Sequence, residues 1–329
     1  MLKYIIGFLI LVLVSFYVMG IGRYEISYMQ MLKVIYAVVL DQPSVDEKLE
    51  YILFNVRIPR IILAIFVGAS LGASGASFQA IFRNPLASPD ILGVASGAGF
   101  GAALALLLGA NVYMLTFFAF VFGVLTLFLT LLVARDYSNR IMIVLGGIII
   151  TAFFQSLISL LKYIADPQDT LPTITYWLLG SLSVSNLGQL VFCCIGMFIG
   201  GLIIVVYRWK HNLLMLDDNE AKSLGLNIVR LRIILIFATT LIVSCVVSIC
   251  GIIGWVGLII PHIARIIVGS NMAKVIPFSL IIGALFMIVI DTFSRSVSSE
   301  EIPISILSAI IGSLFFMAIL FKMKGEMRL

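Results

Sequence analysis

Apolar runs about twenty residues long recur from one end of this chain to the other. Two of them read MLKYIIGFLILVLVSFYVMG and LTFFAFVFGVLTLFLTLLVA, and neither alternates apolar with polar residues. A helix of this length crosses the hydrocarbon core of a bilayer with all its backbone groups paired internally. The strands of a membrane β-barrel would alternate instead. The sequence therefore predicts an all-α polytopic membrane protein.

The composition agrees with this class and sets the number of spans. Hydrophobic residues make up 62% of the chain and charged residues 11%, whereas a soluble domain has about 25% charged residues. The 329 residues hold roughly ten spans with short loops, and we expect a single transmembrane domain over 1–329. The expected spans are about 4–21, 58–80, 91–109, 113–134, 141–163, 187–206, 232–250, 255–268, 275–292 and 303–321.

Small residues recur at four-residue spacing in two of these spans. They are Gly68, Gly72 and Ala76 in the second, and Gly93, Gly97 and Gly101 in the third. Faces of this kind let helix backbones approach closely. We expect them to pack within one subunit rather than to bind a ligand.

A polar segment at about 208–231 interrupts the apolar runs. With Arg232 it holds eight charged residues, where the whole chain has 21 Lys and Arg and 16 Asp and Glu. Its centre, LLMLDDNEAKSLGL, reads as one short amphipathic helix with Gly225 at its C-terminal end. The apolar positions are Leu213, Leu216, Ala221 and Leu224, and the polar ones are Asp217, Asp218, Glu220 and Lys222. Such a segment either docks as a helix in a groove of a partner or is a solvated loop.

The distribution of Lys and Arg predicts the orientation. With ten spans both termini lie on one side, and that side collects 14 of the 21 basic residues. Cytoplasmic loops carry the excess of Lys and Arg. Both termini and the polar segment are therefore expected in the cytoplasm.

Two absences indicate an external source of energy. The chain has no G-x-x-x-x-G-K-[ST] loop for nucleotide phosphates. The predicted span interiors hold no clear ionisable residue, since Lys162 and Asp291 are expected at span ends, and ion-coupled carriers usually keep such groups at depth.

The four cysteines lack metal-ligand spacing, and two histidines alone cannot build a metal site. We therefore predict no catalytic residue, metal or cofactor in this chain.

Five stretches occur in a recognisable order between about residues 57 and 320, which is most of the chain. They are RIPR with RNPLASPDILGVASGAG, then YWLLGSLS, LDDNEAKSLGLNIVRLR, GWVGLIIPHIAR, and DTFSR with EIPISILSAIIGSLFF. Together they resemble the FecCD-type permeases of ATP-driven importers for iron-siderophores, haem and vitamin B12. Two positions depart from that pattern, Trp255 where the family usually has Phe and Leu314 where it usually has Pro.

The resemblance implies a fold similar to the vitamin B12 importer permease, that of a type II ABC importer, with ten spans in a bacterial or archaeal cytoplasmic (inner) membrane. It implies two identical permease subunits with the path between them, two ATPase subunits that hold ATP and Mg, and a periplasmic or lipid-anchored binding protein. A ferric siderophore is the first expected cargo, and haem, cobalamin and molybdate remain open. An ion-coupled secondary transporter and an assembly subunit without a path are the rival interpretations.

The resemblance also implies roles for individual residues. The polar segment would be the coupling helix that contacts the ATPase. Arg57, Arg60 and Arg295 would receive glutamates of the binding protein, since the guanidinium fork holds a carboxylate with two hydrogen bonds; interfacial snorkelling is the alternative. The cytoplasmic gate would comprise Asn84, Leu86, Ser138 and Asn139, for which ordinary turn chemistry is the alternative.

Overall fold

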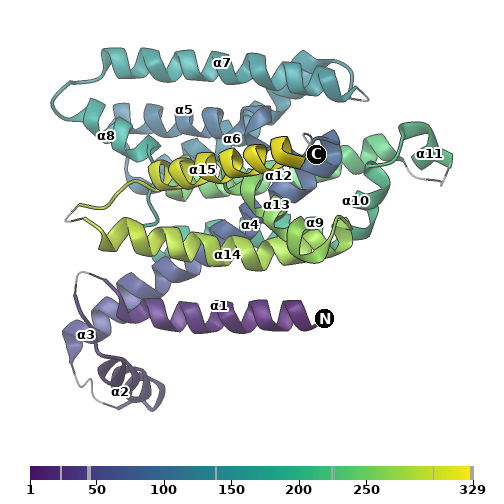
Figure 1. The fold of residues 1–329 in the computed structure, drawn as a ribbon. Helices are drawn as coiled ribbons and strands as arrows, with labels where there is room; N and C mark the ends of the chain where they lie inside the picture. The colour runs from purple at the N-terminus through teal and green to yellow at the C-terminus, as the bar shows by residue number, and fades with distance from the viewer. Residues whose placement is uncertain are drawn as a thin grey trace.

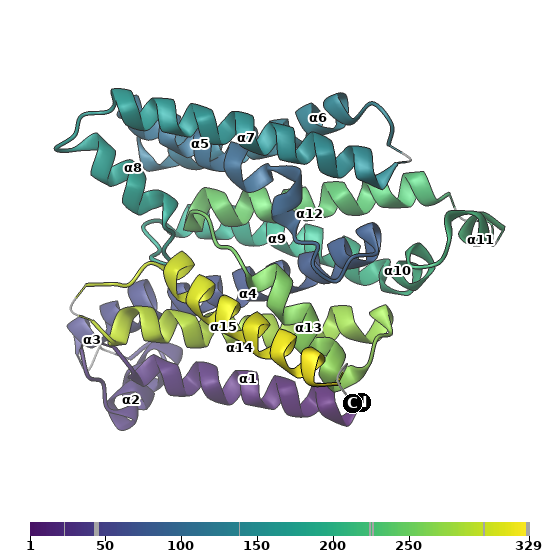
Figure 2. The same ribbon diagram turned by 45° about the horizontal axis from the view of Figure 1, so that its top comes forward.

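The computed structural model describes residues 1–22, 24–42, 46–137, 139–223, 225, 227–298 and 300–326. Helices account for the regular structure throughout these ranges, and no strand occurs within them. Most of the long helices run roughly side by side, with α7 (Arg140–Ile164) along one edge of the bundle and α1 (Leu2–Gly20) along the opposite edge (Figures 1 and 2). The predicted all-α membrane architecture is confirmed.

Seven of the described helices are long and apolar enough to cross a membrane. They are α1, α4 (Ile58–Phe82, preceded without a break by α3, Glu47–Tyr51, and a π-helical turn, Ile52–Arg57), α6 (Val112–Ala134), α7, α9 (Leu187–Val206), α12 (Ile228–Cys250) and α14 (Met272–Ser296). The predicted number of ten spans is not confirmed by length. The other three expected spans correspond to the shorter helices α5 (Val94–Leu107) and α13 (Val256–Val268) and to α15 (Ile304–Glu326), whose apolar stretch is Ile304–Ile319.

The remaining elements are short connections. They are α2 (Tyr28–Val39), a 3-10 turn (Pro89–Leu92), α8 (Thr170–Leu178), α10 (Arg208–Leu214) and α11 (Asp218–Ser223). Helix α13 begins after a break at which Gly251 has φ +72° and Trp255 φ +71°. Pro261 lies inside α13 and does not end it.

Helix α4 is the centre of the bundle because glycines let its neighbours approach it to backbone contact. A Cβ atom at Gly68 would lie 2.1 Å from the carbonyl oxygen of Gly283 in α14, and a Cβ at Gly283 would lie 2.1 Å from that of Gly68. One turn further along α4, a Cβ at Gly72 would lie 2.6 Å from the carbonyl oxygen of Ser279. The small-residue face of the second predicted span therefore packs within the chain, against an antiparallel helix.

In the third predicted span, only part of the row of small residues lies on a helix. Gly97 and Gly101 of α5 pack on α6, where a Cβ at Gly101 would lie 2.4 Å from the carbonyl oxygen of Phe118. Gly93 instead precedes α5 with φ +75°, a conformation that a residue with a Cβ rarely adopts. It therefore serves the turn before α5 rather than a helix face.

Candidate functional site

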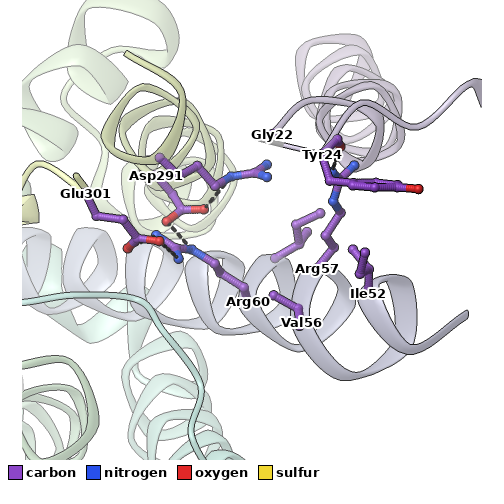
Figure 3. A pocket seen from close by; sticks show the side chains of 10 residues that line it. Gly22, Tyr24, Ile52, Val56, Arg57, Arg60, Asp291 and Glu301 are labelled. Carbon is purple, nitrogen blue, oxygen red and sulfur yellow. Dashed lines mark hydrogen bonds and ion pairs between the residues drawn. The ribbon is translucent and has the colours of Figure 1, made fainter. Parts of the chain in front are cut away.

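Five charged side chains meet where α4 begins and α14 ends (Figure 3). Arg57 ends the π-helical turn before α4, and Arg60 lies in the first turn of α4. Asp291 and Arg295 come from the last turns of α14, and Glu301 from the segment that leads to α15. The glycine contact between the two antiparallel helices sets this register.

The ion pair at the centre of the cluster follows from that register. Arg60 lies eight residues before Gly68, and Asp291 lies eight residues after Gly283, so the two side chains arrive opposite each other. The three arginines that the sequence singles out thus lie in one cluster.

Arg60 is held by two carboxylates at once. Its Nε donates to Asp291 at 2.8 Å, and its Nη1 and Nη2 donate to the two oxygens of Glu301 at 2.8 and 3.0 Å. The Asp291 side chain is 2% exposed and also lies 3.4 Å from Nε of Arg295. Asp291 lies in the last turns of α14, near the end of the span as expected, but it is buried between two arginines.

Arg57 and Arg295 donate mainly to the C-terminal end of α1. Arg57 donates to the carbonyl oxygens of Met19 and Tyr24, and Arg295 to those of Val18, at 3.0 Å, and Ile21. The last carbonyls of a helix have no donor within the helix, so the two guanidinium groups cap α1. Both side chains are buried, and neither extends into solvent as snorkelling requires.

A cavity of about 210 Å³ opens onto the cluster. Its lining residues are Gly22, Tyr24, Ile52, Val56, Arg57, Arg60, Ile61, Asp291, Arg295 and Glu301. Three guanidinium groups face two carboxylates there, which leaves one positive charge in excess. That excess favours a further anionic group. The docking role of the arginines stays a prediction, because the structure contains this chain alone.

The polar segment forms two short helices, so the expectation of a single amphipathic helix is wrong. Helix α10 ends at Leu214, and α11 begins at Asp218 after a turn. Asp217 precedes α11, and its carbonyl oxygen accepts the amide of Ala221 at 2.9 Å. Aspartate favours the start of a new helix over the middle of one. This local preference of aspartate outweighs the spacing of apolar residues, which would favour one continuous helix.

The residues predicted for coupling are spread over both helices and the turn. Leu213 is half-buried on α10, Leu216 is exposed, and Ala221 is buried within the chain rather than presented to a partner. Glu220 is exposed on α11, which lies at the far end of the bundle beyond α10 (Figures 1 and 2). Asp218 and Lys222 belong to α11, and Leu224 lies outside the described residues. Gly225 follows α11 with φ +78°, as expected of a residue just past a helix.

Helix α10 is tied to the centre of the bundle by hydrogen bonds that the sequence analysis did not predict. His211 is completely buried, with its Nδ1 2.9 Å from the carbonyl oxygen of Tyr207 and its Nε2 2.9 Å from the hydroxyl of Ser77 in α4. A carbonyl oxygen only accepts, so Nδ1–H donates to Tyr207. Burial disfavours the charged imidazole, and in the neutral ring Nε2 then accepts from the hydroxyl of Ser77.

Two further contacts complete the attachment of α10. Arg83, at the end of α4, donates from Nε to the carbonyl oxygen of Leu214 at 2.9 Å. The side chain of Asn212 donates to Asn271 at 3.0 Å and accepts the backbone amide of Met272 at 2.8 Å. Movement of α10 would therefore be transmitted to α4 and α14, the two helices whose opposite ends carry the arginine cluster.

Acidification is expected to destabilise the protein through His211. Burial lowers the pKa of this imidazole to about 4, below the ordinary value of about 6.5 that applies in the unfolded chain. Because the unfolded chain takes up the proton first, the contribution of His211 is fully present above about pH 6.5 and is lost as the pH falls towards 4. We expect the free energy of unfolding to fall by about 2 kcal/mol between pH 7 and pH 5. Thermal unfolding in detergent at the two pH values measures this loss.

The chain offers a matched control for this pH effect. Gln at position 211 removes the titrating group, so His211→Gln should lower stability at pH 7 and flatten the dependence on pH. His262→Gln removes the only other histidine and should retain the acid-sensitive step. An undiminished step in His211→Gln would show that another group is responsible.

The residues predicted for the gate occupy turns and a helix cap. Asn84 accepts the amide of Leu86 on its side-chain oxygen at 2.9 Å, and the Leu86 side chain is exposed. Asn139 caps α7 by accepting the amide of Ile141 at 3.0 Å. Ser138 lies outside the described residues. These contacts are ordinary turn chemistry, and the gate role stays a prediction.

Comparison with known proteins gives close relatives along nearly the whole chain. The permease protein of a molybdate import system from Haemophilus influenzae is 41% identical over 318 residues, which cover 96% of this chain and 94% of the relative. A permease protein from Helicobacter pylori, assigned to iron chelatin transport, is 37% identical over 279 residues, which cover 84% of each chain.

A solved structure agrees with these relatives. It is described as an inward-facing conformation of an ABC transporter assigned to the metal-chelate type, and it superposes with a TM-score of 0.88 at 40% identity, covering 97% of this chain and 99% of the other. The model of the FecCD transport family matches residues 9–322. The chain therefore belongs to the FecCD transport family, the family that the order of its five motifs indicated.

Proposed function

We propose that this chain forms the translocation path of an ATP-driven importer for a metal-containing solute. The chain belongs to a family of permease subunits of ABC transporters, which are transport components and not enzymes. The observation that carries the proposal is the superposition, over almost the whole chain, on a transporter assigned to the metal-chelate type. ATP and Mg would bind to a separate ATPase subunit.

The assembly that we propose contains two copies of this chain. Helices α5, α13 and α15 would complete ten spans with the seven long ones, and both termini would lie on the cytoplasmic side of the inner membrane, where most Lys and Arg residues fall. Helix α15 leaves Ile306, Ile310, Leu314 and Met317 exposed within a single chain. A partner subunit or lipid would cover this apolar face.

The two ends of α4 and α14 would receive the two kinds of partner. One end carries the arginine cluster, where the acidic groups of a binding protein would dock. The other end is tied through α10 to the exposed helix α11, where the ATPase would bind. Closure of the ATPase dimer would then move α4 and α14 together, since their backbones are in contact.

A ferric siderophore is the first candidate for the cargo, as the resemblance implies. Molybdate is the second, because the relative from Haemophilus influenzae that aligns over nearly the whole chain is named for it. Both are metal-containing and polar, and a path that bound either tightly would slow its release.

The cargo can be identified by uptake in cells that lack their own systems for both solutes. We expect cells that express the permease with its ATPase and binding protein to accumulate a labelled ferric siderophore, with no inhibition by excess molybdate. Accumulation of labelled molybdate instead would replace the first candidate with the second. Uptake of neither solute would contradict both candidates and turn the same assay to haem and cobalamin, which the resemblance also implies.

Nothing in the comparisons supports an ion-coupled secondary transporter. The buried ionisable residues Arg60, Asp291 and Arg295 weaken the argument from empty span interiors. They are, however, paired with one another at the ends of two helices, whereas a coupling site needs groups that can exchange an ion or proton at depth. An assembly subunit without a path would bind the ATPase and show no ATP-dependent uptake.

A further inference from the structure

We infer that Glu301 occupies, from within the chain, the place on Arg60 that a carboxylate of the docking protein needs. The inference rests on the proposed docking role of the arginine cluster. Docking would then be an exchange of one carboxylate for another, and Glu301 would be an internal competitor that sets the affinity for the binding protein.

The hydrogen-bonding capacity of Arg60 supports this inference. Its Nε is committed to the buried Asp291, and the edge formed by Nη1 and Nη2 is filled by the two oxygens of Glu301 at 2.8 and 3.0 Å. A planar guanidinium group binds a carboxylate through such an edge with two parallel hydrogen bonds. An incoming carboxylate cannot use this edge while Glu301 holds it.

The burial of the two acids indicates which of them can leave. The Asp291 side chain is 2% exposed and lies between two arginines, so its departure would leave two buried positive charges. The Glu301 side chain is 38% exposed and lines the cavity. Glu301 is thus the acid that solvent and a partner can reach.

The backbone around Glu301 is held by bonds that do not involve its carboxylate. The amide of Ile302 donates to the carbonyl oxygen of Ser294 at 3.0 Å, and the hydroxyl of Ser294 donates to the carbonyl oxygen of Ile302 at 2.6 Å. The amide of Ile304 donates to the carbonyl oxygen of Gly180 at 3.1 Å. The side chain of Glu301 can therefore swing away from Arg60 while the segment before α15 keeps its path.

The charge balance of the cavity favours a replacement. With Glu301 in place the three arginines exceed the two carboxylates by one charge, and the excess rises to two when Glu301 swings out. A docking carboxylate restores the original balance and the same pair of hydrogen bonds. Because the incoming carboxylate must first displace Glu301, removal of this competitor should tighten docking.

Binding of the purified binding protein to the permease complex in lipid nanodiscs tests the inference. We expect Glu301→Gln to bind it about fivefold more tightly than the unsubstituted chain, which is the effect of removing one partly exposed ion pair. Glu300→Gln is the matched control, because it removes the same charge from the neighbouring exposed residue. It should bind as the unsubstituted chain does.

A second substitution separates this inference from the docking proposal. Arg60→Lys keeps a positive charge beside Asp291 but cannot present a two-pronged edge, so it should weaken binding and abolish the gain from Glu301→Gln. If Arg60→Lys binds normally, the docking role of Arg60 is wrong and the inference falls with it. If Arg60→Lys binds weakly while Glu301→Gln binds no more tightly than Glu300→Gln, docking stands and the internal competitor is wrong.

Discussion

Alanine at Gly68 or at Gly283 is expected to disrupt the centre of the bundle. The added Cβ would lie 2.1 Å from the carbonyl oxygen of the facing glycine, and the obstacle is backbone rather than the end of a flexible side chain. The two helices would have to separate along their contact, and overpacking costs about 1–3 kcal/mol and occasionally more. A backbone obstacle places this substitution at the upper end of that range. We expect a large fall in the thermal midpoint and in the yield of folded protein in detergent.

Gly201 provides the control for these two substitutions. It also lies inside a long helix, α9, and a Cβ added there would meet nothing within 4 Å. Alanine has the higher helix propensity, so Gly201→Ala should leave stability unchanged or raise it by up to about 1 kcal/mol. Equal thermal midpoints for Gly68→Ala and Gly201→Ala would refute the close contact of α4 with α14.

Reversing two charges of the polar segment is expected to separate the permease from its ATPase. Asp217 lies in the turn before α11 and Glu220 is exposed on that helix, away from the packed centre. Two like charges placed against a complementary surface cost several kcal/mol, so Asp217→Arg with Glu220→Arg should reduce binding of the ATPase by at least about 100-fold. Co-purification on a tagged permease measures the loss, and an unchanged thermal midpoint shows that the chain still folds.

The control reverses two exposed acids at the other end of the bundle. Glu25 precedes α2 and Glu47 begins α3, which lies at the opposite end of the molecule from α11 (Figure 1). Glu25→Arg with Glu47→Arg should retain the ATPase. Loss of the ATPase from both double variants, or from neither, would contradict the assignment of the polar segment to coupling.

The positions of the helices follow from the sequence because apolar runs and their polar flanks are local signals. The span expected at 187–206 coincides with α9, and that expected at 113–134 differs from α6 by one residue at its start. Length is less predictable than position. Helix α5, expected over 91–109, is shorter because the turn at Gly93 begins it late, whereas α13 agrees with the short span expected at 255–268 to within one residue.

The contacts of the arginine cluster could not be predicted from the sequence. The burial of Asp291 depends on the register between α4 and α14, which the contact of Gly68 with Gly283 sets across more than 200 residues of chain. The capping of α1 by Arg57 and Arg295 depends on where a third helix ends. Neither the burial of Asp291 nor the capping of α1 produces a pattern of residues along the sequence.

The polar segment shows the same limit at shorter range. Its amphipathic period suggested one helix, but the local preference of Asp217 for a helix start divides the segment into α10 and α11. No spacing of residues in the sequence indicated that His211 is buried. Its partner Ser77 belongs to another helix, and its neighbour Tyr207 gives only the spacing of one helical turn.

The most direct test of the proposed function is solute uptake by proteoliposomes that contain the permease, its ATPase and the binding protein. We predict that solute accumulates only when Mg-ATP is available to the ATPase, that collapse of proton and sodium gradients has no effect, and that Asp217→Arg with Glu220→Arg abolishes accumulation. Uptake that persists without ATP and follows an ion gradient would contradict the importer and show a secondary carrier instead.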